Sequence, residues 1–357
     1  MHARRRPAGL WRIVTIALPA LAVCGLVACA GGSGTSSSSG AAGSPLPTVA
    51  AAAGLGWLQR QYEQVVSRVL PSVVQISTGT GTGSGVVYDG RGDIVTNAHV
   101  VGTAATVGVS PASGGTALPA KVTGVFAPDD LAVITVQRGA ASLKPAVFGR
   151  SAAVRVGEIV LAMGNPLGLS GTVTDGIVSA TGRTVSEGQG SSAVLISAIQ
   201  TSAAINPGNS GGALVDLSGR VIGIPTLAAT DPQMGGAAAG IGFAIPSDTV
   251  TSIARQLITT GKVSNSGRAS LGITAETVAD TAGQPTGIGV VSVRGAAAAA
   301  GIRAGDIIVS VAGQPTKSVT ALQAVLALHK PGDRVPVRLA RNGSTSTVTV
   351  TLGSLTS

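Results

Sequence analysis

Short apolar runs separated by turn residues dominate the middle of the chain. Between about residues 72 and 223, β-branched and other apolar residues gather in brief runs, and clusters of Gly, Asn, Asp and Pro separate them. Many short strands punctuated by turns predict a β-barrel or sandwich rather than alternating βαβ units. The predicted strands are 73–77, 85–88, 94–96, 132–136, 159–163, 194–199 and 221–224.

Helical spacing of apolar residues appears on either side of this β-rich region. Residues 58–70 have an apolar face and stop at Pro71, which cannot continue a helix. Residues 247–260 repeat the pattern, and the polar stretch 261–267 (GKVSNSG) after them indicates a domain boundary.

Residues 268–357 form a second, smaller unit with strands around one helix. The segment Thr320-Ala321-Leu322-Gln323 has the spacing of a capping box and would open the helix. His329 and Lys330 would then lie at its end as cations, before a Pro-Gly pair that stops it. The predicted strands are 271–275, 288–293, 306–311, 334–340 and 345–352, and the predicted helix is 321–328.

The N-terminus, residues 1–29, has the layout of an export signal. Four arginines lie in the first twelve residues, and the apolar run 13–28 is shorter than the ~20 residues of a spanning helix. The run ends in Leu26-Val27-Ala28-Cys29, which resembles the lipobox of bacterial lipoproteins. A lipid anchor at Cys29, an uncleaved membrane anchor and ordinary secretion are the three interpretations, and all place the body outside the cytoplasm. Residues 30–56, rich in Gly, Ser and Ala, are predicted to be a flexible linker.

Composition narrows the classes of function. The 357 residues allow about two domains, and 44% hydrophobic with only 11% charged residues excludes a wholly disordered chain. The net charge of +9 suggests nucleic acid as a partner, but 2% aromatics leave little on which bases could stack, so no nucleic acid is expected. Two cysteines, both in the leader, and three histidines are too few for a structural zinc module, so no metal or cofactor is expected.

Three patches of the β-rich body carry candidate chemistry. They are TNAHVV around His99, DDLAVI around Asp130 and NPGNSGGAL around Ser210, in the chain order of chymotrypsin-type barrels. A serine hydroxyl needs a neutral imidazole to take its proton, and a carboxylate must orient that imidazole. Glycines beside the serine allow a turn that aims backbone N–H groups at a developing oxyanion. Gly208 and Ser210 would be the donors, with Asn209 between them.

Taken together, the motifs resemble the HtrA/Deg family of bacterial envelope serine proteases with a single C-terminal PDZ domain. The resemblance covers about residues 60–354. It rests on GTGSGVVYD at 81–89, TNAHVV, DLAVI, MGNPLGL at 163–169, VTDGIVSA at 173–180, AAINPGNSGGAL at 203–214 and IGFAIPS at 241–247.

The resemblance implies a mainly β fold. A chymotrypsin-like double β-barrel protease domain would occupy residues 57–260, and a small α+β PDZ domain would occupy 268–357. The triad of the family falls on His99, Asp130 and Ser210; Asp130 is preferred to Asp129 because the aspartate of the motif directly precedes Leu-Ala.

Two segments depart from the usual family pattern. Gln200-Thr201-Ser202 stands where the family often has Gln-Thr-Asp, and Gly223-Ile224-Pro225 where it often has Gly-Ile-Asn. Proline lacks an N–H that could bind substrate at the specificity wall. Ile205 and Ile224 are predicted to lie near the substrate pocket and to favour a small aliphatic residue before the cleaved bond.

In the C-terminal unit, Ser270-Leu271-Gly272-Ile273 resembles the carboxylate-binding loop of PDZ domains. Its N–H groups would receive the terminal carboxylate of a peptide, which would add as a strand beside the 321–328 helix. The alternative is a packing domain without a peptide ligand.

The function expected from these patterns is an extracytoplasmic serine endopeptidase for unfolded or misfolded polypeptides. It would need no cofactor, and its membrane contact would be the lipid anchor or N-terminal helix. The family implies a homo-oligomer, a trimer, with Trp57 and Tyr62 as contact residues. A non-catalytic chaperone or adaptor, and a surface-binding lipoprotein, are the alternatives. Asp89 and Asp93 flank a Gly-Arg-Gly turn and are predicted to be hairpin residues rather than metal ligands.

Overall fold

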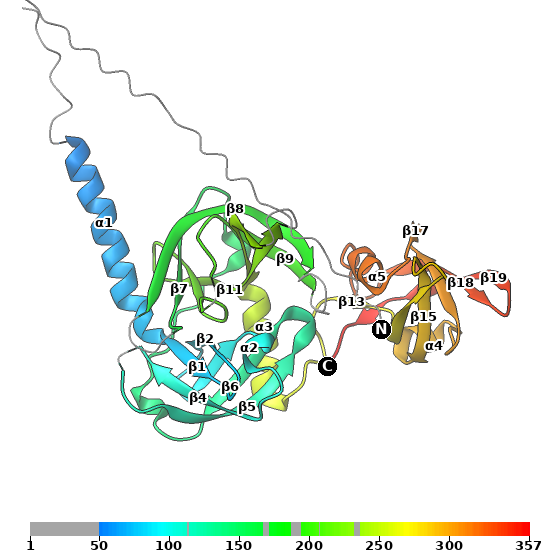
Figure 1. The fold of residues 1–357 in the computed structure, drawn as a ribbon, viewed down its shortest axis with the longest axis horizontal. Helices are drawn as coiled ribbons and strands as arrows, with labels where there is room; N and C mark the ends of the chain where they lie inside the picture. The colour runs from blue at the N-terminus through cyan, green and yellow to red at the C-terminus, as the bar shows by residue number, and fades with distance from the viewer. Residues whose placement is uncertain (1–49, 113, 167–170, 187–193, 207, 232–235) are drawn as a thin grey trace, which may run out of the picture. The chain divides into compact units, whose positions relative to one another are not determined.

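The protein is described here from a computed structural model that places residues 50–357, except 113, 167–170, 187–193, 207 and 232–235 (Figure 1). The predicted signal segment and Cys29 lie outside these residues. The described chain is mostly β, as predicted, and it has a double-barrel region followed by a smaller α+β unit.

The first barrel is a closed sheet of six antiparallel strands in the order β1-β2-β3-β6-β5-β4. Alternate side chains point inward, and Ile76, Ile94 and Ile134 are fully buried in its core. The short helix α2 (Ala98–Val101) follows β3. The strands are β1 (Val73–Ser77), β2 (Thr82–Val87), β3 (Asp93–Thr96), β4 (Thr106–Pro111), β5 (Leu118–Phe126) and β6 (Leu131–Val136).

The second barrel has the same construction, in the order β10-β11-β12-β9-β8-β7. One apolar cluster contains residues of both barrels, among them Val86, Val95 and Met163, together with Val250 and Leu257 of helix α3. This shared core joins the barrels. The elements are β7 (Ile159–Gly164), β8 (Thr172–Ser186), β9 (Val194–Thr201), β10 (Ala213–Asp216), β11 (Val221–Asp231), β12 (Gly236–Pro246) and α3 (Ser247–Thr260).

Strands rich in glycine and alanine were missed by the sequence patterns. Residues such as those of β12 have little intrinsic β preference, and pairing with neighbouring strands decides their conformation. Helix α1 (Ala50–Val69) begins inside the stretch predicted as linker, because its opening alanines are strong helix formers. It is followed by the 3-10 turn Leu70–Ser72, which contains Pro71.

The C-terminal unit has its own apolar core, which includes Leu271, Ile308 and Leu322. Its main sheet has the order β14-β15-β16-β18-β19, and β13 pairs with β20. The elements are β13 (Ala269–Ser270), β14 (Ile273–Ala279), β15 (Pro285–Val293), α4 (Gly295–Ala299), β16 (Ile307–Val311), β17 (Gln314–Pro315), α5 (Val319–Leu326), β18 (Arg334–Arg341), β19 (Ser344–Thr351) and β20 (Gly353–Ser354).

The start of α5 corrects one prediction. The N-cap is Ser318 rather than Thr320, and the Ser318 side chain accepts a hydrogen bond from the Ala321 N–H at 3.1 Å. Ser318 has the extended backbone that an N-cap needs, so the helix starts at Val319, two residues before the predicted start at 321. His329 lies beyond the helix end, and its Nδ1 is 3.3 Å from the Asp333 carboxylate.

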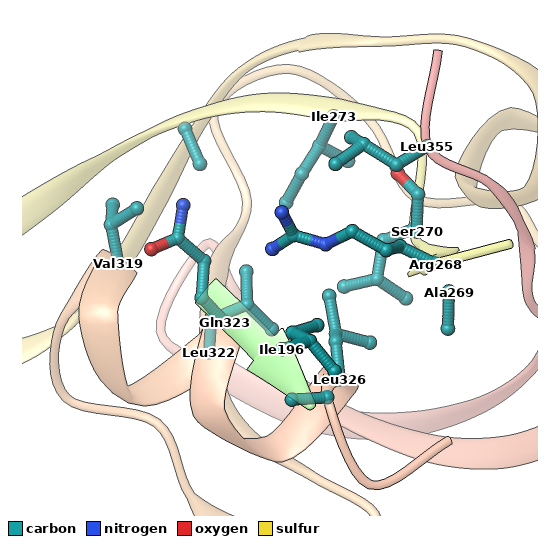
Figure 2. Close-up of a pocket in the computed structure, with 13 residues that line it drawn as sticks. Ile196, Arg268, Ala269, Ser270, Ile273, Val319, Leu322, Gln323, Leu326 and Leu355 are labelled. Atoms are coloured by element: carbon teal, nitrogen blue, oxygen red, sulfur yellow. The ribbon is translucent and has the colours of Figure 1, made fainter. Parts of the chain in front are cut away.

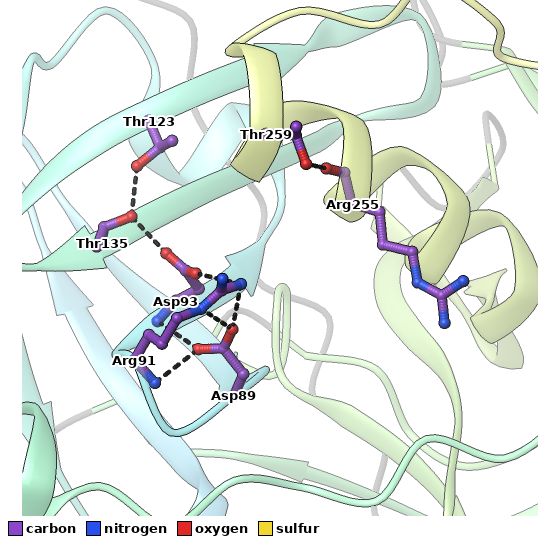
Figure 3. A network of polar contacts seen from close by, with 7 residues as sticks. All are labelled: Asp89, Arg91, Asp93, Thr123, Thr135, Arg255 and Thr259. Carbon is purple, nitrogen blue, oxygen red and sulfur yellow. Dashed lines mark hydrogen bonds and ion pairs between the residues drawn. The ribbon is translucent and has the colours of Figure 1, made fainter.

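The turn between β2 and β3 confirms the interpretation of Asp89 and Asp93 as hairpin residues (Figure 3). Asp89 accepts hydrogen bonds from the backbone N–H and the Nε of Arg91, both at 2.9 Å. Asp93 accepts a hydrogen bond from the Thr135 hydroxyl at 2.6 Å, and burial raises the pKa of the Asp93 carboxyl.

None of the helices placed by the structure is long and apolar enough to cross a membrane.

Candidate active site

His99 and Asp130 are in direct contact: His99 lies in α2, after β3, and Asp130 directly precedes β6. The His99 Nδ1 lies 2.8 Å from Asp130 Oδ2, and the His99 backbone N–H donates to Asp130 Oδ1 at 2.9 Å. The carboxylate is almost fully buried, with 3% of its side chain exposed, whereas 45% of the His99 side chain is exposed. A carboxylate on Nδ1 favours the tautomer that carries its hydrogen on Nδ1, so that Nε2 can act as the base.

The backbone around Asp130 explains how the carboxylate reaches the ring. Asp130 follows the 3-10 turn Ala127–Asp129 and has a left-handed conformation (φ 49°, ψ 42°), which aspartate tolerates better than most residues. Its carbonyl accepts hydrogen bonds from the Ala98 N–H and from Asn97 Nδ2, both at 3.0 Å. The Asn-Ala pair that precedes His99 therefore holds the aspartate segment against α2.

Asp129 has a different environment from its neighbour. Its Oδ1 lies 2.5 Å from Nη1 of Arg268, and the same Nη1 donates to the Pro128 carbonyl. Burial raises the pKa of the Asp129 carboxyl, and the charge of Arg268 opposes that effect. The contact with His99 is made by Asp130, the aspartate chosen from the motif, and the catalytic role of Asp130 stays a prediction.

Thr226 joins Ser210 to the same carboxylate. The Ser210 hydroxyl donates to the Thr226 carbonyl at 3.2 Å, and the Thr226 hydroxyl donates to Asp130 Oδ2 at 2.5 Å. Thr226 is buried in β11, next to Pro225 of the departing Gly-Ile-Pro segment. Sequence reasoning missed it; a hydroxyl residue on the strand beside the nucleophile loop was the available signal.

The loop around Ser210 needs its glycines. Gly208 and Gly211 have φ values of +109° and +79°, which side chains disfavour. A Cβ on Gly211 would overlap the Ser84 carbonyl oxygen and the Thr96 hydroxyl. Asn209, buried between the two predicted oxyanion donors, donates its N–H to the Asn206 carbonyl at 3.0 Å and so shapes the turn.

Ile205 and Ile224, predicted near the substrate pocket, are both buried. Ile224 belongs to the apolar cluster shared by the barrels, and Ile205 belongs to the core of the second barrel. The carbonyl of Pro225 accepts the Gly211 N–H at 3.0 Å. The influence of the two isoleucines on cleavage preference stays a prediction.

A groove of about 150 Å³ lies between β14 and α5, where the PDZ resemblance placed a peptide (Figure 2). Apart from Arg268, Ser270 and Gln323, its lining is apolar. The residues that line it are Ile196, Arg268, Ala269, Ser270, Leu271, Ile273, Ala275, Val319, Leu322, Gln323, Leu326, Ala327 and Leu355.

The predicted carboxylate loop contributes Ser270, Leu271 and Ile273 to the lining of this groove. The Leu271 carbonyl accepts the Ala297 N–H at 2.8 Å, and the Gly272 carbonyl accepts the Arg294 N–H at 2.7 Å. Gly272 has φ +76°, and a Cβ there would overlap the Arg294 carbonyl, so only glycine fits.

Within the placed part of the chain, no cluster of three or more His, Cys, Asp or Glu side chains could hold a metal ion.

Comparison with known proteins adds independent information. Residues 83–224 match the trypsin-like peptidase domain, and residues 269–352 match the PDZ domain. Serine protease PepD of Mycobacterium tuberculosis is 41% identical over 317 residues, which are 82% of this chain and 66% of PepD. The periplasmic pH-dependent serine endoprotease DegQ of Escherichia coli is 38% identical over 288 residues, 78% of this chain and 60% of DegQ. The chain thus spans somewhat less than two thirds of the length of these curated relatives.

Two solved structures are similar over nearly their whole length. The serine endoprotease from Yersinia pestis is 38% identical with a TM-score of 0.55, and the match covers 82% of this chain and 98% of that one. The HtrA-type protease AlgW with a decapeptide is 31% identical with a TM-score of 0.56, at the same coverages of 82% and 98%.

Proposed function

Because the chain belongs to the HtrA family of serine proteases, we propose that it is an endopeptidase that hydrolyses unfolded or misfolded polypeptides in the bacterial cell envelope. One observation carries the proposal. The Asp130 carboxylate bonds both the ring and the backbone of His99, and Thr226 connects that carboxylate to the Ser210 hydroxyl.

The proposed mechanism is acyl transfer through Ser210. His99 Nε2 takes the hydroxyl proton while Oγ attacks the peptide carbonyl, and Asp130 stabilises the imidazolium that forms. The N–H groups of Gly208 and Ser210, on either side of Asn209, receive the oxyanion. His99 gives its proton to the leaving amine, then takes one from water, which attacks the acyl-enzyme and releases the second product.

We propose that the groove beside α5 binds the C-terminal segment of a peptide and regulates the protease. Its apolar lining suits apolar side chains, and the segment Ser270–Ile273 beside it, which resembles the carboxylate-binding loop of PDZ domains, is the proposed site for a terminal carboxylate. AlgW, a similar HtrA-type protease, has been solved with a decapeptide. Arg268 supports a regulatory role, because it lines the groove and also bonds Asp129, one residue before Asp130.

The cellular setting is part of the same proposal. The leader and the periplasmic location named for DegQ support an envelope location, with lipidation of Cys29 or an N-terminal helix as the membrane contact. A trimer is proposed from the family, and Trp57, 56% exposed on α1, together with Tyr62, supplies aromatic surface for it. Mass spectrometry of the mature N-terminus tests Cys29: a diacylglycerol-modified cysteine is expected, and an unmodified later residue would exclude it.

A fluorophosphonate probe and casein test the protease directly. The wild-type chain should be labelled once and should cleave casein, whereas Ser210→Ala should do neither. Ser202→Ala, on an exposed serine of the same region, is the matched control and should behave as wild type. Absence of labelling and of cleavage, with and without apolar C-terminal peptides, would reject the protease and favour a chaperone or adaptor. Full cellular function of Ser210→Ala would favour a surface-binding lipoprotein.

A further inference from the structure

Ser84, in the GTGSGVVYD motif, lies in β2 and bonds both the loop around Ser210 and Thr96 of β3. Ser84 pairs with Gln75 of β1, whereas the pairing of β2 with β3 covers only Val86 and Val87 and does not reach Ser84. Its N–H donates to the Ser210 carbonyl at 3.0 Å, and its carbonyl accepts the Thr96 hydroxyl at 2.7 Å. The residue is fully buried, so these bonds are shielded from water.

The side chain of Ser84 reaches the same loop. Its hydroxyl donates to the Gly208 carbonyl at 2.5 Å and accepts the Asn165 N–H at 2.8 Å. Ser84 therefore bonds the carbonyls of both Gly208 and Ser210, the two residues proposed to donate to the oxyanion.

The glycines on either side explain why β2 lies so close to the catalytic residues. A Cβ on Gly83 would lie 2.7 Å from both methyl groups of Val100, the residue after His99. A Cβ on Gly85 would lie 2.7 Å from side-chain carbons of Ile76 and Ile94 in the barrel core. The Gly-Ser-Gly triplet thus lets the strand pack tightly while it offers one hydroxyl to the loop.

We propose that Ser84 is a positioning residue that holds the oxyanion hole in its working geometry, an inference that rests on the proposed protease function. Peptide groups are planar, so a bond to the carbonyl of Gly208 restrains the peptide plane that follows the first donor. Gly208, with φ +109°, has the conformational freedom of glycine and needs such a restraint. Donors aimed in advance at the developing charge are the source of oxyanion stabilisation.

The test compares Ser84→Ala with the wild type on a peptide amide substrate. Loss of a direct oxyanion donor costs about 10²–10³ in kcat, so loss of its restraint should lower kcat about 10- to 100-fold with KM unchanged. A trifluoromethyl ketone of the same peptide forms an oxyanion on Ser210, and its Ki should rise by the same factor. The Ki of the non-covalent product peptide should not change, because that peptide has no oxyanion.

Ser247→Ala is the matched control. Ser247 is also fully buried, and its hydroxyl also donates to a backbone carbonyl, that of Gly149 at 2.8 Å, away from the nucleophile loop. This variant should stay within about threefold of wild type in kcat and in both Ki values. A Ser84→Ala enzyme within about threefold of wild type, or one that loses affinity for both inhibitors equally, would overturn the inference.

A second variant of Ser84 and the activity of the wild type separate the remaining outcomes. If Ser84→Ala does not fold, Ser84→Cys carries the same expectation, because a thiol fills similar space but is a weak donor; a fully active cysteine variant would overturn the inference. A wild-type chain that is neither labelled nor proteolytic rejects the proposed function and this inference together. An active wild type with an equally active Ser84→Ala rejects the role of Ser84 alone.

Discussion

The Thr226 hydroxyl donates to Asp130 Oδ2, the same carboxylate oxygen that faces Nδ1 of His99. Thr226 lies in β11 of the second barrel, whereas Asp130 directly precedes β6 of the first. This hydrogen bond therefore restrains the Asp130 carboxylate from the barrel that also carries Ser210, the proposed nucleophile.

Thr226→Val should lower kcat about 10-fold with little change in KM. Valine has nearly the same shape as threonine, but it cannot donate a hydrogen bond, so the buried Asp130 Oδ2 loses one of its partners. Thr226→Ser keeps the hydroxyl and should retain most activity. Steady-state kinetics on a peptide amide decide the matter, and equal loss in both variants would show that side-chain packing, not the hydrogen bond, matters.

Arg268→Met should destabilise the protein by about 3 kcal/mol, because it leaves the buried Asp129 carboxylate without its cation. Adding Asp129→Asn should recover much of that loss, since no uncompensated charge then remains. Thermal unfolding of the two variants gives the comparison. An additive effect of the two substitutions would contradict the expected coupling.

The loss of stability caused by Arg268→Met should also depend on pH, and it should be smaller at acidic pH. Burial raises the folded-state pKa of Asp129 above its unfolded value, so the ionised form penalises the folded state above the folded pKa. The penalty disappears as pH falls through that pKa. The difference in Tm between Arg268→Met and wild type should therefore shrink on acidification, and a constant difference would rule this explanation out.

The stability that the Asp306–Arg341 ion pair contributes should depend on pH in the opposite direction. Hydrogen bonds from Arg341 lower the pKa of the Asp306 carboxyl, and Arg341 Nη2 also donates to the Gly301 carbonyl at 2.9 Å. A lowered folded-state pKa stabilises the protein above the unfolded pKa, and the stabilisation is lost as pH falls through the folded pKa. Arg341→Gln should lower the Tm by roughly 2–4 °C at pH 7 and by progressively less below about pH 4.

Gly272→Ala should weaken binding of an apolar C-terminal peptide by about 10-fold or more, because the Cβ meets the Arg294 carbonyl in a conformation with φ +76°. Gly283→Ala is the matched control, since Gly283 has φ +77° in the same unit but open space around its Cβ. Fluorescence anisotropy of a labelled peptide measures both. Tight binding of the C-terminally amidated peptide would contradict the proposed carboxylate contact.

Sequence patterns predicted the fold best where local preference and tertiary structure agree. The β-branched strand Val73–Ser77 and the amphipathic helix Ser247–Thr260 have the predicted bounds. The strand Gly236–Pro246 was invisible because glycine and alanine carry no strong β preference, and its partners in β11 and β9 determine its structure.

In the candidate site, too, some residues could be identified from the sequence and others could not. His99, Asp130 and Ser210 stand in motifs whose residue types have a chemical purpose, so the sequence singled them out; the structure brings His99 and Asp130 together, and the catalytic roles of the three residues stay a prediction. The contacts of Ser84 and Thr226 were not, since Ser84 bonds a carbonyl 124 residues away and Thr226 bonds a carboxylate 96 residues away. Every residue has a backbone carbonyl, so the sequence does not indicate which carbonyl Ser84 will bond.

The residues of the proposed catalytic site come from both barrels: His99 and Asp130 belong to the first, Ser210 and Thr226 to the second. Separation of the barrels along their shared core would break the bonds of Ser84 and Thr226 while each barrel was still largely folded. Hydrolysis should therefore cease at an early stage of heat or denaturant damage. Under the proposed function, the protease would in this way become inert before it turned into an unfolded chain itself, which would protect neighbouring proteins from a damaged protease.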